Sequence, residues 1–257
     1  MRLASLALLL LLGCRSSPSE PTEPNKPAPS LAPPAPELAL QSVTVTDMPE
    51  RERGGTLVVL LHGYGAAGDD LVPLARQLLK PKTRFVVPAA PLTAGSGRAW
   101  WSFDPAERPA HAYTDEAPAD YRGSAQLVRA RHAVQQLLRD AQQRYAPERL
   151  ALAGFSQGAM LSLDVALAGD PPVARAVVLS GVLVADALPA LKAPHATRPA
   201  FFISHGIGDQ VLPIAGGEAA SHLLQAHGYQ CQFVPFDGGH TIPRHVLPAV
   251  GRFLFEG

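Results

Sequence analysis

Short apolar runs alternate with amphipathic segments along most of the chain, from about residue 37 to the end. Residues 57–61 are apolar at every position, which indicates a strand that is buried on both faces. Residues 124–144 instead repeat apolar side chains at helical spacing, with Arg and Gln between them. The patterns predict strands at residues 38–46, 56–61, 84–88, 149–153, 174–180, 200–204 and 230–236. They predict helices at residues 69–79, 124–144, 158–168, 216–227 and 244–255.

This alternation predicts one α/β domain with a doubly wound, mostly parallel sheet and helices on both faces. Residues 38–46 alternate apolar and polar side chains, so we expect them to form an antiparallel edge strand. Residues 91–121 show neither period and are rich in Pro, Gly and aromatic residues. Because long irregular loops are often functional, we expect this segment to overhang the strand ends and to shape a substrate pocket.

The first residues have the layout of a secretory signal. A positively charged start precedes a nearly unbroken apolar run, residues 3–12, which is too short to span a bilayer as a mature helix. Cleavage as an ordinary signal peptide after Gly13 is the plainer interpretation. Residues 11–14, Leu-Leu-Gly-Cys, resemble the bacterial lipobox, in which the cysteine becomes the lipidated first residue. We therefore expect a signal peptide at residues 1–13 and lipidation of Cys14.

Proline recurs throughout residues 16–36 and favours extended polyproline conformations. This composition indicates a tether, and binding to a proline-recognising groove of a partner is the alternative. We expect lipidated Cys14 and the tether to occupy residues 14–37, and the folded domain to occupy residues 38–257. In lipoproteins of two-membrane bacteria, an Asp beside the lipidated Cys often signals inner-membrane retention. Arg15 stands there, so the resemblance implies an exported lipoprotein anchored in the outer membrane, with its domain on the periplasmic or surface face.

The composition supports a sizeable core and excludes one class of partner. Of the 257 residues, 47% are hydrophobic and 17% are charged, and the formal net charge is zero. A nucleic-acid partner is not expected, because phosphate binding needs a local excess of Lys and Arg and no basic stripe appears. If Cys14 carries lipid, no disulfide can form within the chain, because Cys231 is the one other cysteine. Cys231 lies in an apolar run and is expected to be a small core residue.

The segment Gly154-Phe155-Ser156-Gln157-Gly158 lies directly after an expected strand and directly before an expected helix. The motif G-x-S-x-G alone is a weak signal, because short Gly/Ser patterns occur by chance and an ordinary glycine-rich turn would fit it. Between a strand and a helix it is typical of a nucleophile elbow, a sharp turn that exposes the serine hydroxyl at the end of a sheet. Ser156 is therefore the candidate nucleophile.

A serine nucleophile needs a base, and the base needs an orienting carboxylate. In the α/β-hydrolase fold the order along the chain is serine, acid, histidine. Asp209 follows one expected strand after Ser156, and His240 follows the next. Because loops at the carboxyl ends of parallel strands converge, we expect Ser156, Asp209 and His240 to form a catalytic triad.

Other acids and histidines are weaker candidates for these roles. Asp186 follows the strand expected at residues 174–180, where some hydrolases of this fold carry the acid. Asp237 is too close in sequence to His240 to reach around it easily. His205 precedes a tight turn and is expected to bond to the backbone. Two further histidines lie near strand ends or helix starts, His62 and His245.

Acyl transfer also needs hydrogen-bond donors for the developing oxyanion. One is expected to be the backbone N–H of Gln157, directly after the candidate nucleophile. The other is expected to be the backbone N–H of Tyr64, in the glycine-rich loop at residues 61–65. Asp69 and Asp70 invite a metal hypothesis, but capping of a helix N-terminus explains them more simply, so no metal is expected.

Together these segments resemble the phospholipase/carboxylesterase family of α/β-hydrolases, which includes the acyl-protein thioesterases. The matching pieces are Leu61-His62-Gly63-Tyr64-Gly65, Asp69-Asp70-Leu71, Arg98-Ala99-Trp100, Gly154-Phe155-Ser156-Gln157-Gly158, His205-Gly206 with Asp209 and Val211-Leu212-Pro213, and Gly239-His240. The resemblance implies an α/β-hydrolase fold and a cofactor-independent esterase that acts on carboxylic esters or thioesters. Two departures are Ala159, where many members have glycine, and the double Trp100-Trp101, which puts the acyl-chain preference in doubt.

Trp100, Trp101 and Phe103 are candidate walls of the substrate pocket, and core packing under the loop is the alternative for them. We expect an exported, membrane-tethered serine carboxylesterase that acts on small-molecule or lipid esters without a cofactor. A thioesterase or lysophospholipase of the same family is a neighbouring alternative. A catalytically retired hydrolase domain that acts as a binding lipoprotein is a rival of another class. A peptidase fits less well, because the chain lacks the additional domain or long lid that such enzymes often carry.

Overall fold

The computed structural model describes residues 37–49, 52–102, 125–194 and 198–256, all within the unit Ala35–Gly257. Two predicted site residues, Cys14 and Phe103, lie outside the described residues, as do the expected signal peptide and most of the expected tether.

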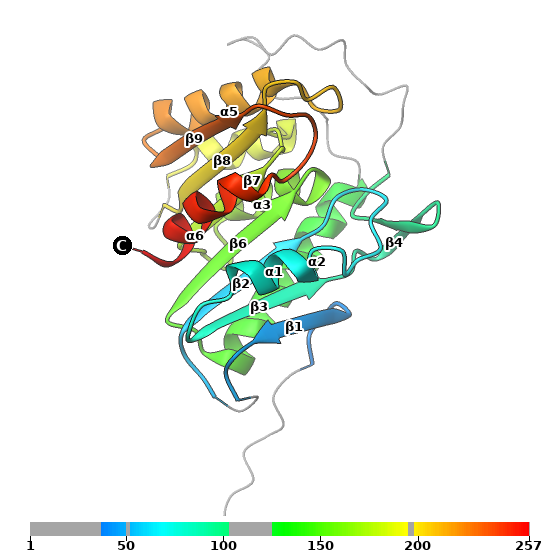
Figure 1. Cartoon of the computed structure of the whole chain (residues 1–257), viewed down its shortest axis with the longest axis vertical. Coiled ribbons are helices and arrows are strands. Elements are labelled where there is room, and N and C mark those ends of the chain that lie inside the picture. The colour runs from blue at the N-terminus through cyan, green and yellow to red at the C-terminus, as the bar shows by residue number, and fades with distance from the viewer. Residues whose placement is uncertain (1–36, 50–51, 103–124, 195–197, 257) are drawn as a thin grey trace, which may run out of the picture. The chain divides into compact units, whose positions relative to one another are not determined.

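A seven-stranded sheet forms the centre of this unit (Figure 1). Its strands are β1 Ser42–Thr46, β2 Thr56–Leu61, β3 Thr83–Pro88, β6 Arg149–Phe155, β7 Arg175–Leu179, β8 Ala200–Gly206 and β9 Cys231–Phe236. They lie in the order β1-β3-β2-β6-β7-β8-β9, and every neighbouring pair is parallel except β1 with β3. The predicted mostly parallel sheet and its antiparallel edge strand are confirmed.

Helices cover both faces of the sheet. Successive residues of an inner strand point to opposite sides, so each inner strand contributes apolar side chains to two buried clusters. In β2, Leu57 and Val59 belong to one buried cluster, whereas Val58 and Leu60 belong to another. The first cluster includes side chains of α2 Ala125–Tyr145, α3 Gln157–Ala168, α4 Leu188–Lys192 and α5 Ile214–Ala226. The second includes side chains of α1 Val72–Leu78 and α6 Leu247–Phe255, which cross in front of the strands in Figure 1. None of the helices among the described residues is long and apolar enough to cross a membrane.

The segment expected to be an irregular loop at residues 91–121 begins with an ordered hairpin. β4 Leu92–Ala94 pairs antiparallel with β5 Gly97–Ala99. A Cβ atom on Gly97 would lie 2.0 Å from the carbonyl oxygen of Gly65, so the hairpin packs backbone to backbone against the loop after β2. Strands of three residues are too short to show a period of two, which explains why the pattern did not indicate them.

Helix starts differ from expectation at two places. The residue before α1 is Leu71, and it makes no side-chain capping bond, so the prediction that Asp69 and Asp70 cap this helix is wrong. The N–H of Val72 instead donates to the carbonyl oxygen of Asp69 at 2.9 Å. The single helix predicted at residues 244–255 is divided into a 3-10 turn, η3 Arg244–Val246, and α6, which has a proline in its first turn. A similar turn, η2 Ala185–Ala187, precedes α4.

Candidate active site

Ser156 lies at a sharp turn between β6 and α3. Its backbone dihedral angles are φ 53° and ψ −120°, a conformation that non-glycine residues rarely adopt and that costs about 1–3 kcal/mol. Its N–H donates to the carbonyl oxygen of Leu179 in β7 at 2.9 Å, and its own carbonyl oxygen accepts from Ala159 and Met160. These bonds hold the strained turn, and the Ser156 side chain remains partly exposed at the carboxyl end of the sheet.

Close backbone contacts explain the two glycines beside Ser156. A Cβ atom on Gly154 would lie 2.3 Å from the carbonyl oxygen of Gly158. A Cβ atom on Gly158 would lie 2.3 Å from the carbonyl oxygen of Leu61 and 2.5 Å from that of His62. Because these neighbours are backbone atoms, they cannot rotate away from a larger residue. The glycines therefore allow the elbow to pack against the end of β2.

Substitution of Gly158 by alanine is expected to destabilise the fold by about 3 kcal/mol, the upper end of the range for overpacking. Gly251→Ala in α6 is the matched control, because the nearest atom to its added Cβ would be Leu78 Cδ2 at 4.0 Å. Removal of this helix glycine is expected to stabilise the fold by about 0.5–1 kcal/mol. Urea unfolding of both variants checks the pair, and equal stabilities would contradict the contact that we assign to Gly158.

Asp209 and His240 lie in the loops after β8 and β9, and close packing brings these loops together. A Cβ atom on Gly206, the last residue of β8, would lie 2.3 Å from the carbonyl oxygen of Gly239. The His240 ring packs on the ring of Phe155, with centroids 4.9 Å apart. Three loops from β6, β8 and β9 therefore meet at the carboxyl edge of the sheet, as the sequence predicts.

Hydrogen bonds join the three predicted triad residues into one chain. His240 Nε2 lies 2.8 Å from Ser156 Oγ, and His240 Nδ1 lies 2.7 Å from Asp209 Oδ2. The Asp209 side chain is fully buried, and its other oxygen, Oδ1, accepts the N–H groups of Val211 and Leu212 at 2.9 Å each. Because the carboxylate accepts, Nδ1 of His240 carries the proton and Nε2 presents its lone pair to Ser156. In this tautomer His240 can accept the hydroxyl proton of Ser156.

The two predicted oxyanion donors belong to segments that flank Ser156. A Cβ atom on Gly63 would lie 3.3 Å from the Cβ of Ser156, so the loop that carries Tyr64 passes beside the serine. The N–H of Gly65 anchors this loop by donating to a carbonyl oxygen of β5 at 2.8 Å. Gln157 is the first residue of α3, and the N–H groups of the first helical turn have no acceptor within the helix.

The side chain of Gln157 has a bracing role that the sequence interpretation missed. It is fully buried; its Oε1 accepts the N–H of Trp100 at 2.9 Å, and its Nε2 donates to the carbonyl oxygen of Trp101 at 2.7 Å. Trp100 Nε1 in turn donates to the carbonyl oxygen of His62 at 2.9 Å. This network links the elbow, the segment after β5 and the loop after β2. The sequence feature that could have indicated this role is a glutamine at the start of a helix that is buried on all sides, because a buried polar side chain needs hydrogen-bond partners.

Trp100 and Trp101 lie in the core, and the two residues are 1% and 4% exposed. Both belong to the buried cluster that α2 and α3 share with the sheet. Little of their surface is available to a substrate, and core packing, the alternative for these two residues, accounts for their burial.

Comparison with known proteins places these features in a family. The sequence matches the phospholipase/carboxylesterase family over residues 44–256, most of the chain. The chain belongs to this family. A relative in it, a probable carboxylesterase of Oryza sativa subsp. japonica, is 28% identical over 232 residues, which cover 87% of this chain and 85% of the relative. Acyl-protein thioesterase 1 of Neurospora crassa is 25% identical over 226 residues, which cover 81% and 89% of the two chains.

Solved structures agree with the family assignment. The crystal structure of esterase PE8 has a TM-score of 0.68 at 30% identity and covers 84% of this chain and 97% of its own. A Bacillus cereus carboxylesterase has a TM-score of 0.61 at 16% identity, which shows the shared fold alone. The chain is therefore an α/β-hydrolase and a serine hydrolase of the phospholipase/carboxylesterase type.

In this phospholipase/carboxylesterase family member, three of the alternative acids and histidines are not part of the hydrogen-bonded chain of Ser156, His240 and Asp209. Asp186 is in η2, where its charge acts on the ion pair of Arg131 with Asp164, whose atoms are 2.7 Å apart between α2 and α3. Asp237 is exposed, and His245 is exposed in η3. The described residues contain no group of three or more His, Cys, Asp or Glu side chains arranged to hold a metal ion.

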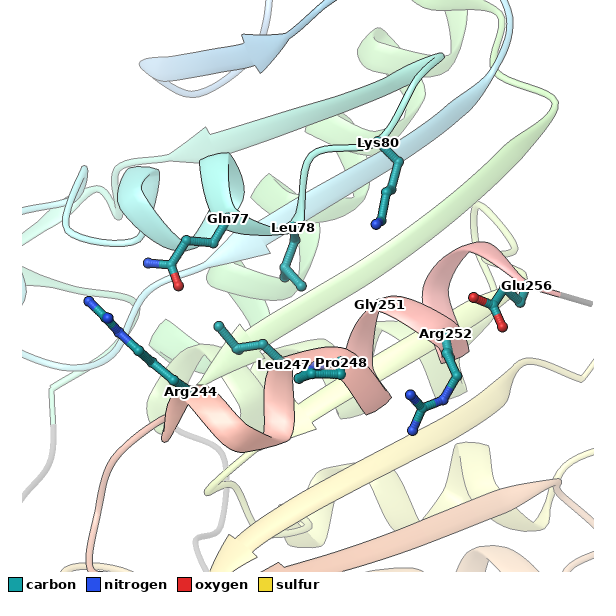
Figure 2. A pocket seen from close by; sticks show the side chains of 9 residues that line it. All are labelled: Gln77, Leu78, Lys80, Arg244, Leu247, Pro248, Gly251, Arg252 and Glu256. Atoms are coloured by element: carbon teal, nitrogen blue, oxygen red, sulfur yellow. The ribbon is translucent and has the colours of Figure 1, made fainter.

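A groove lies between α1 and α6 (Figure 2). Its volume is about 580 Å³, and Leu78 and Leu247 form part of its apolar lining. Basic side chains of Lys80, Arg244 and Arg252 lie around it. None of the predicted triad residues lines this groove. The evidence for the candidate active site of this family member is therefore the hydrogen-bond geometry of Ser156, His240 and Asp209, and not this groove.

Two buried histidines near the site are held in their neutral forms. His62 Nδ1 donates to the carbonyl oxygen of Gly63 at 2.7 Å, and its Nε2 accepts the N–H of Ala90 at 3.0 Å. Burial lowers the pKa of His62 below its ordinary value of 6.5. His205 donates through Nε2 to the carbonyl oxygen of Leu212 at 2.7 Å, the expected backbone bond, and burial also lowers its pKa. A second proton on the His62 ring would face the N–H group of Ala90, and one on the His205 ring would find no acceptor among the described residues.

The free energy of unfolding is expected to be at its full value above about pH 6.5 and to fall as the pH drops below it. The unfolded chain binds protons on both histidines near pH 6.5, whereas the folded chain binds them only at lower pH. Acid therefore favours the unfolded state. Urea unfolding at pH 7.5, 6.5 and 5.5 measures this dependence, and a flat free energy across that window would contradict the neutral assignment.

Proposed function

We propose that this serine hydrolase cleaves carboxylic esters through an acyl-enzyme intermediate, with Ser156 as nucleophile, His240 as base and acid, and Asp209 as orienting carboxylate. The observation that carries the proposal is the hydrogen-bonded chain, with 2.8 Å between Ser156 Oγ and His240 Nε2 and 2.7 Å between His240 Nδ1 and Asp209 Oδ2. Kinship with proteins named as carboxylesterases supports ester substrates.

In the first half-reaction, Ser156 Oγ attacks the ester carbonyl carbon while His240 Nε2 takes the hydroxyl proton. The tetrahedral intermediate collapses, the carbon–oxygen bond to the alcohol breaks, and His240 returns its proton to the departing alcohol. In the second half-reaction, water repeats the attack on the acyl-enzyme and releases the acid. The buried Asp209 carboxylate holds the His240 tautomer and stabilises the imidazolium that forms in each half.

Backbone N–H groups of Tyr64 and Gln157 stabilise the oxyanion of each tetrahedral intermediate. The contact of Gly63 with Ser156 supports the first donor, and the position of Gln157 at the start of α3 supports the second. The bracing amide of Gln157 ties its own backbone to the loop that carries Tyr64, through Trp100 and His62. The two donors are therefore held relative to each other before substrate binds.

Hydrolysis of p-nitrophenyl esters from acetate to palmitate by the full chain in detergent tests this proposal. We expect ester turnover, and we expect the ester of a given acyl chain to be cleaved with a higher kcat/KM than its thioester. Protein with Ser156→Ala gives the rate that remains without the nucleophile, together with the background from detergent and contaminants. Failure of the folded protein to cleave any ester or thioester would overturn the proposal. A preference for the thioester would change the proposed substrate to a thioester, in line with the Neurospora crassa relative, which is named an acyl-protein thioesterase.

We also propose that the chain is exported and tethered to a membrane through lipid on Cys14, with the proline-rich segment as tether and a small-molecule or lipid ester as substrate. The lipobox-like residues 11–14 and the apolar run before them support this location. The proposed lipid is a thioether-linked diacylglycerol together with an amide-linked acyl chain on Cys14. Its three acyl chains would anchor the protein firmly, because each buried CH₂ contributes about 0.8 kcal/mol.

Mass spectrometry of the mature N-terminus tests the anchor. We expect cleavage before Cys14 and a lipid mass on that residue, and we expect Cys14→Ser to abolish both. An unmodified Cys14, or cleavage at another residue, would contradict the tether.

A further inference from the structure

His205, near the end of β8, is a fully buried side chain that the proposed reaction does not yet use. Its Nε2 donates to the carbonyl oxygen of Leu212 at 2.7 Å and lies 3.4 Å from Asp209 Oδ2. Its other nitrogen, Nδ1, is buried without a hydrogen-bond partner among the described residues. Burial of a nitrogen without a partner costs free energy, so an apolar residue of similar size would fill the same space at a lower cost. The Nε2–H group is the feature that an apolar residue would lack.

The Nε2–H group acts on the turn that holds the carboxylate of Asp209. The N–H groups of Val211 and Leu212 both donate to Asp209 Oδ1 at 2.9 Å. Leu212 therefore bonds twice, through its N–H to Asp209 and through its carbonyl oxygen to His205. The remaining carboxylate oxygen, Oδ2, accepts from His240 Nδ1 and faces His205 Nε2. His205 thus contacts both the turn and the oxygen that orients His240.

The surroundings hold the His205 ring in place and keep it neutral. A Cβ atom on Gly217 would lie 2.6 Å from His205 Nδ1, so α5 closes directly over the ring. The charged and titratable groups that act on it are Asp209, His240 and Glu218. Burial has the largest effect and lowers the pKa of His205, so the ring acts as a neutral donor beside the carboxylate.

We propose that His205 is a positioning residue that fixes the turn from Asp209 to Leu212, and thereby keeps Asp209 Oδ2 aligned with His240 Nδ1. This inference rests on the proposed function, in which that alignment selects the reactive tautomer of His240. A misplacement of about 1 Å in a catalytic constellation lowers rates by roughly 100-fold, which makes such support valuable.

Two substitutions separate the hydrogen bond from the space that the ring fills. We expect His205→Leu to lower kcat by about 10- to 100-fold with little change in KM, and to shift the acid limb of the pH profile of kcat/KM. We expect His205→Gln, whose amide nitrogen can reach the carbonyl oxygen of Leu212, to recover most of the loss. His227→Leu is the matched control, because His227 also bonds to a backbone carbonyl, that of Leu223 at 2.9 Å, but at the end of α5.

A second readout needs no substrate. The proton between His240 Nδ1 and Asp209 gives a low-field NMR signal, which we expect in the wild type and His205→Gln and expect to broaden or vanish in His205→Leu. If folded His205→Leu keeps the wild-type kcat, pH profile and low-field signal, the inference is overturned. Equal impairment of the Leu and Gln variants also overturns it. If the wild type hydrolyses no ester, the proposed function fails, while the NMR comparison still tests the positioning.

Discussion

Replacement of Ser156 by alanine is expected to lower kcat by roughly 10⁵- to 10⁶-fold, as removal of a triad serine does in other hydrolases. The variant keeps the proposed oxyanion donors, so we expect its residual rate to exceed the uncatalysed rate by roughly 10³- to 10⁴-fold. KM should change little, because the hydroxyl makes its largest contribution in the transition state. Steady-state hydrolysis of a short p-nitrophenyl ester measures both constants.

Ser162→Ala is the matched control for this experiment. Ser162 lies in α3, the helix that begins directly after Ser156, but its buried hydroxyl donates to the carbonyl oxygen of Gly158 at 2.8 Å. Its loss should leave kcat within a few-fold of the wild type. A Ser156→Ala protein with more than about one tenth of wild-type kcat would contradict the role of Ser156 as nucleophile.

Asp209→Asn is expected to lower kcat by about 10⁴-fold while leaving the fold intact. The two backbone N–H groups at Oδ1 require an acceptor there, so the amide oxygen of the variant must take that position. The amide NH₂ then replaces Oδ2 and faces His240 Nδ1. Two donors cannot bond, so the ring adopts the other tautomer, in which Nε2 carries the proton and cannot accept one from Ser156. Structural integrity is checked by the free energy of unfolding.

Asp237→Asn and Asp186→Asn are the controls that separate Asp209 from the alternative acids. Asp237 is exposed and lies three positions before His240, and Asp186 acts on the Arg131–Asp164 pair instead. Both variants should keep kcat within a few-fold of the wild type. A larger loss in either control than in Asp209→Asn would transfer the role of the acid to that residue.

The strands and the order of the site residues could be predicted because each rests on a local signal. The strand predicted at residues 56–61 coincides with β2, since a short run of apolar residues is typical of an inner strand that helices cover on both faces. The loops of Ser156, Asp209 and His240 could be placed at one edge because parallel strands bring their carboxyl ends together. The approach of those loops follows from that topology and from the glycines at their close contacts.

The features that the sequence did not predict depend on contacts between distant segments. The β4–β5 hairpin packs on the loop after β2, and no period reports such a contact. Gln157 was assigned a role through its backbone alone, whereas its side chain bonds to residues more than fifty positions away. His205 was expected to bond to the backbone, and it does. The sequence could not identify the acceptor, Leu212 in the turn of Asp209, because that contact depends on the fold. Asp69 and Asp70 lie near the start of α1, but Leu71 occupies the capping position. The sequence pattern did not place the start of this helix closely enough to show this.

Covalent labelling by a fluorophosphonate probes the assignment of Ser156 as nucleophile, because it reports an activated serine without any assumption about the natural ester. We expect one adduct, mapped by peptide mass spectrometry to Ser156, that forms rapidly in the wild type, far more slowly in Asp209→Asn and not at all in Ser156→Ala. A folded wild-type protein that remains unlabelled would contradict the assignment of Ser156, His240 and Asp209 and would favour a binding role for the domain. An adduct that maps to another residue would transfer the role of nucleophile to that residue.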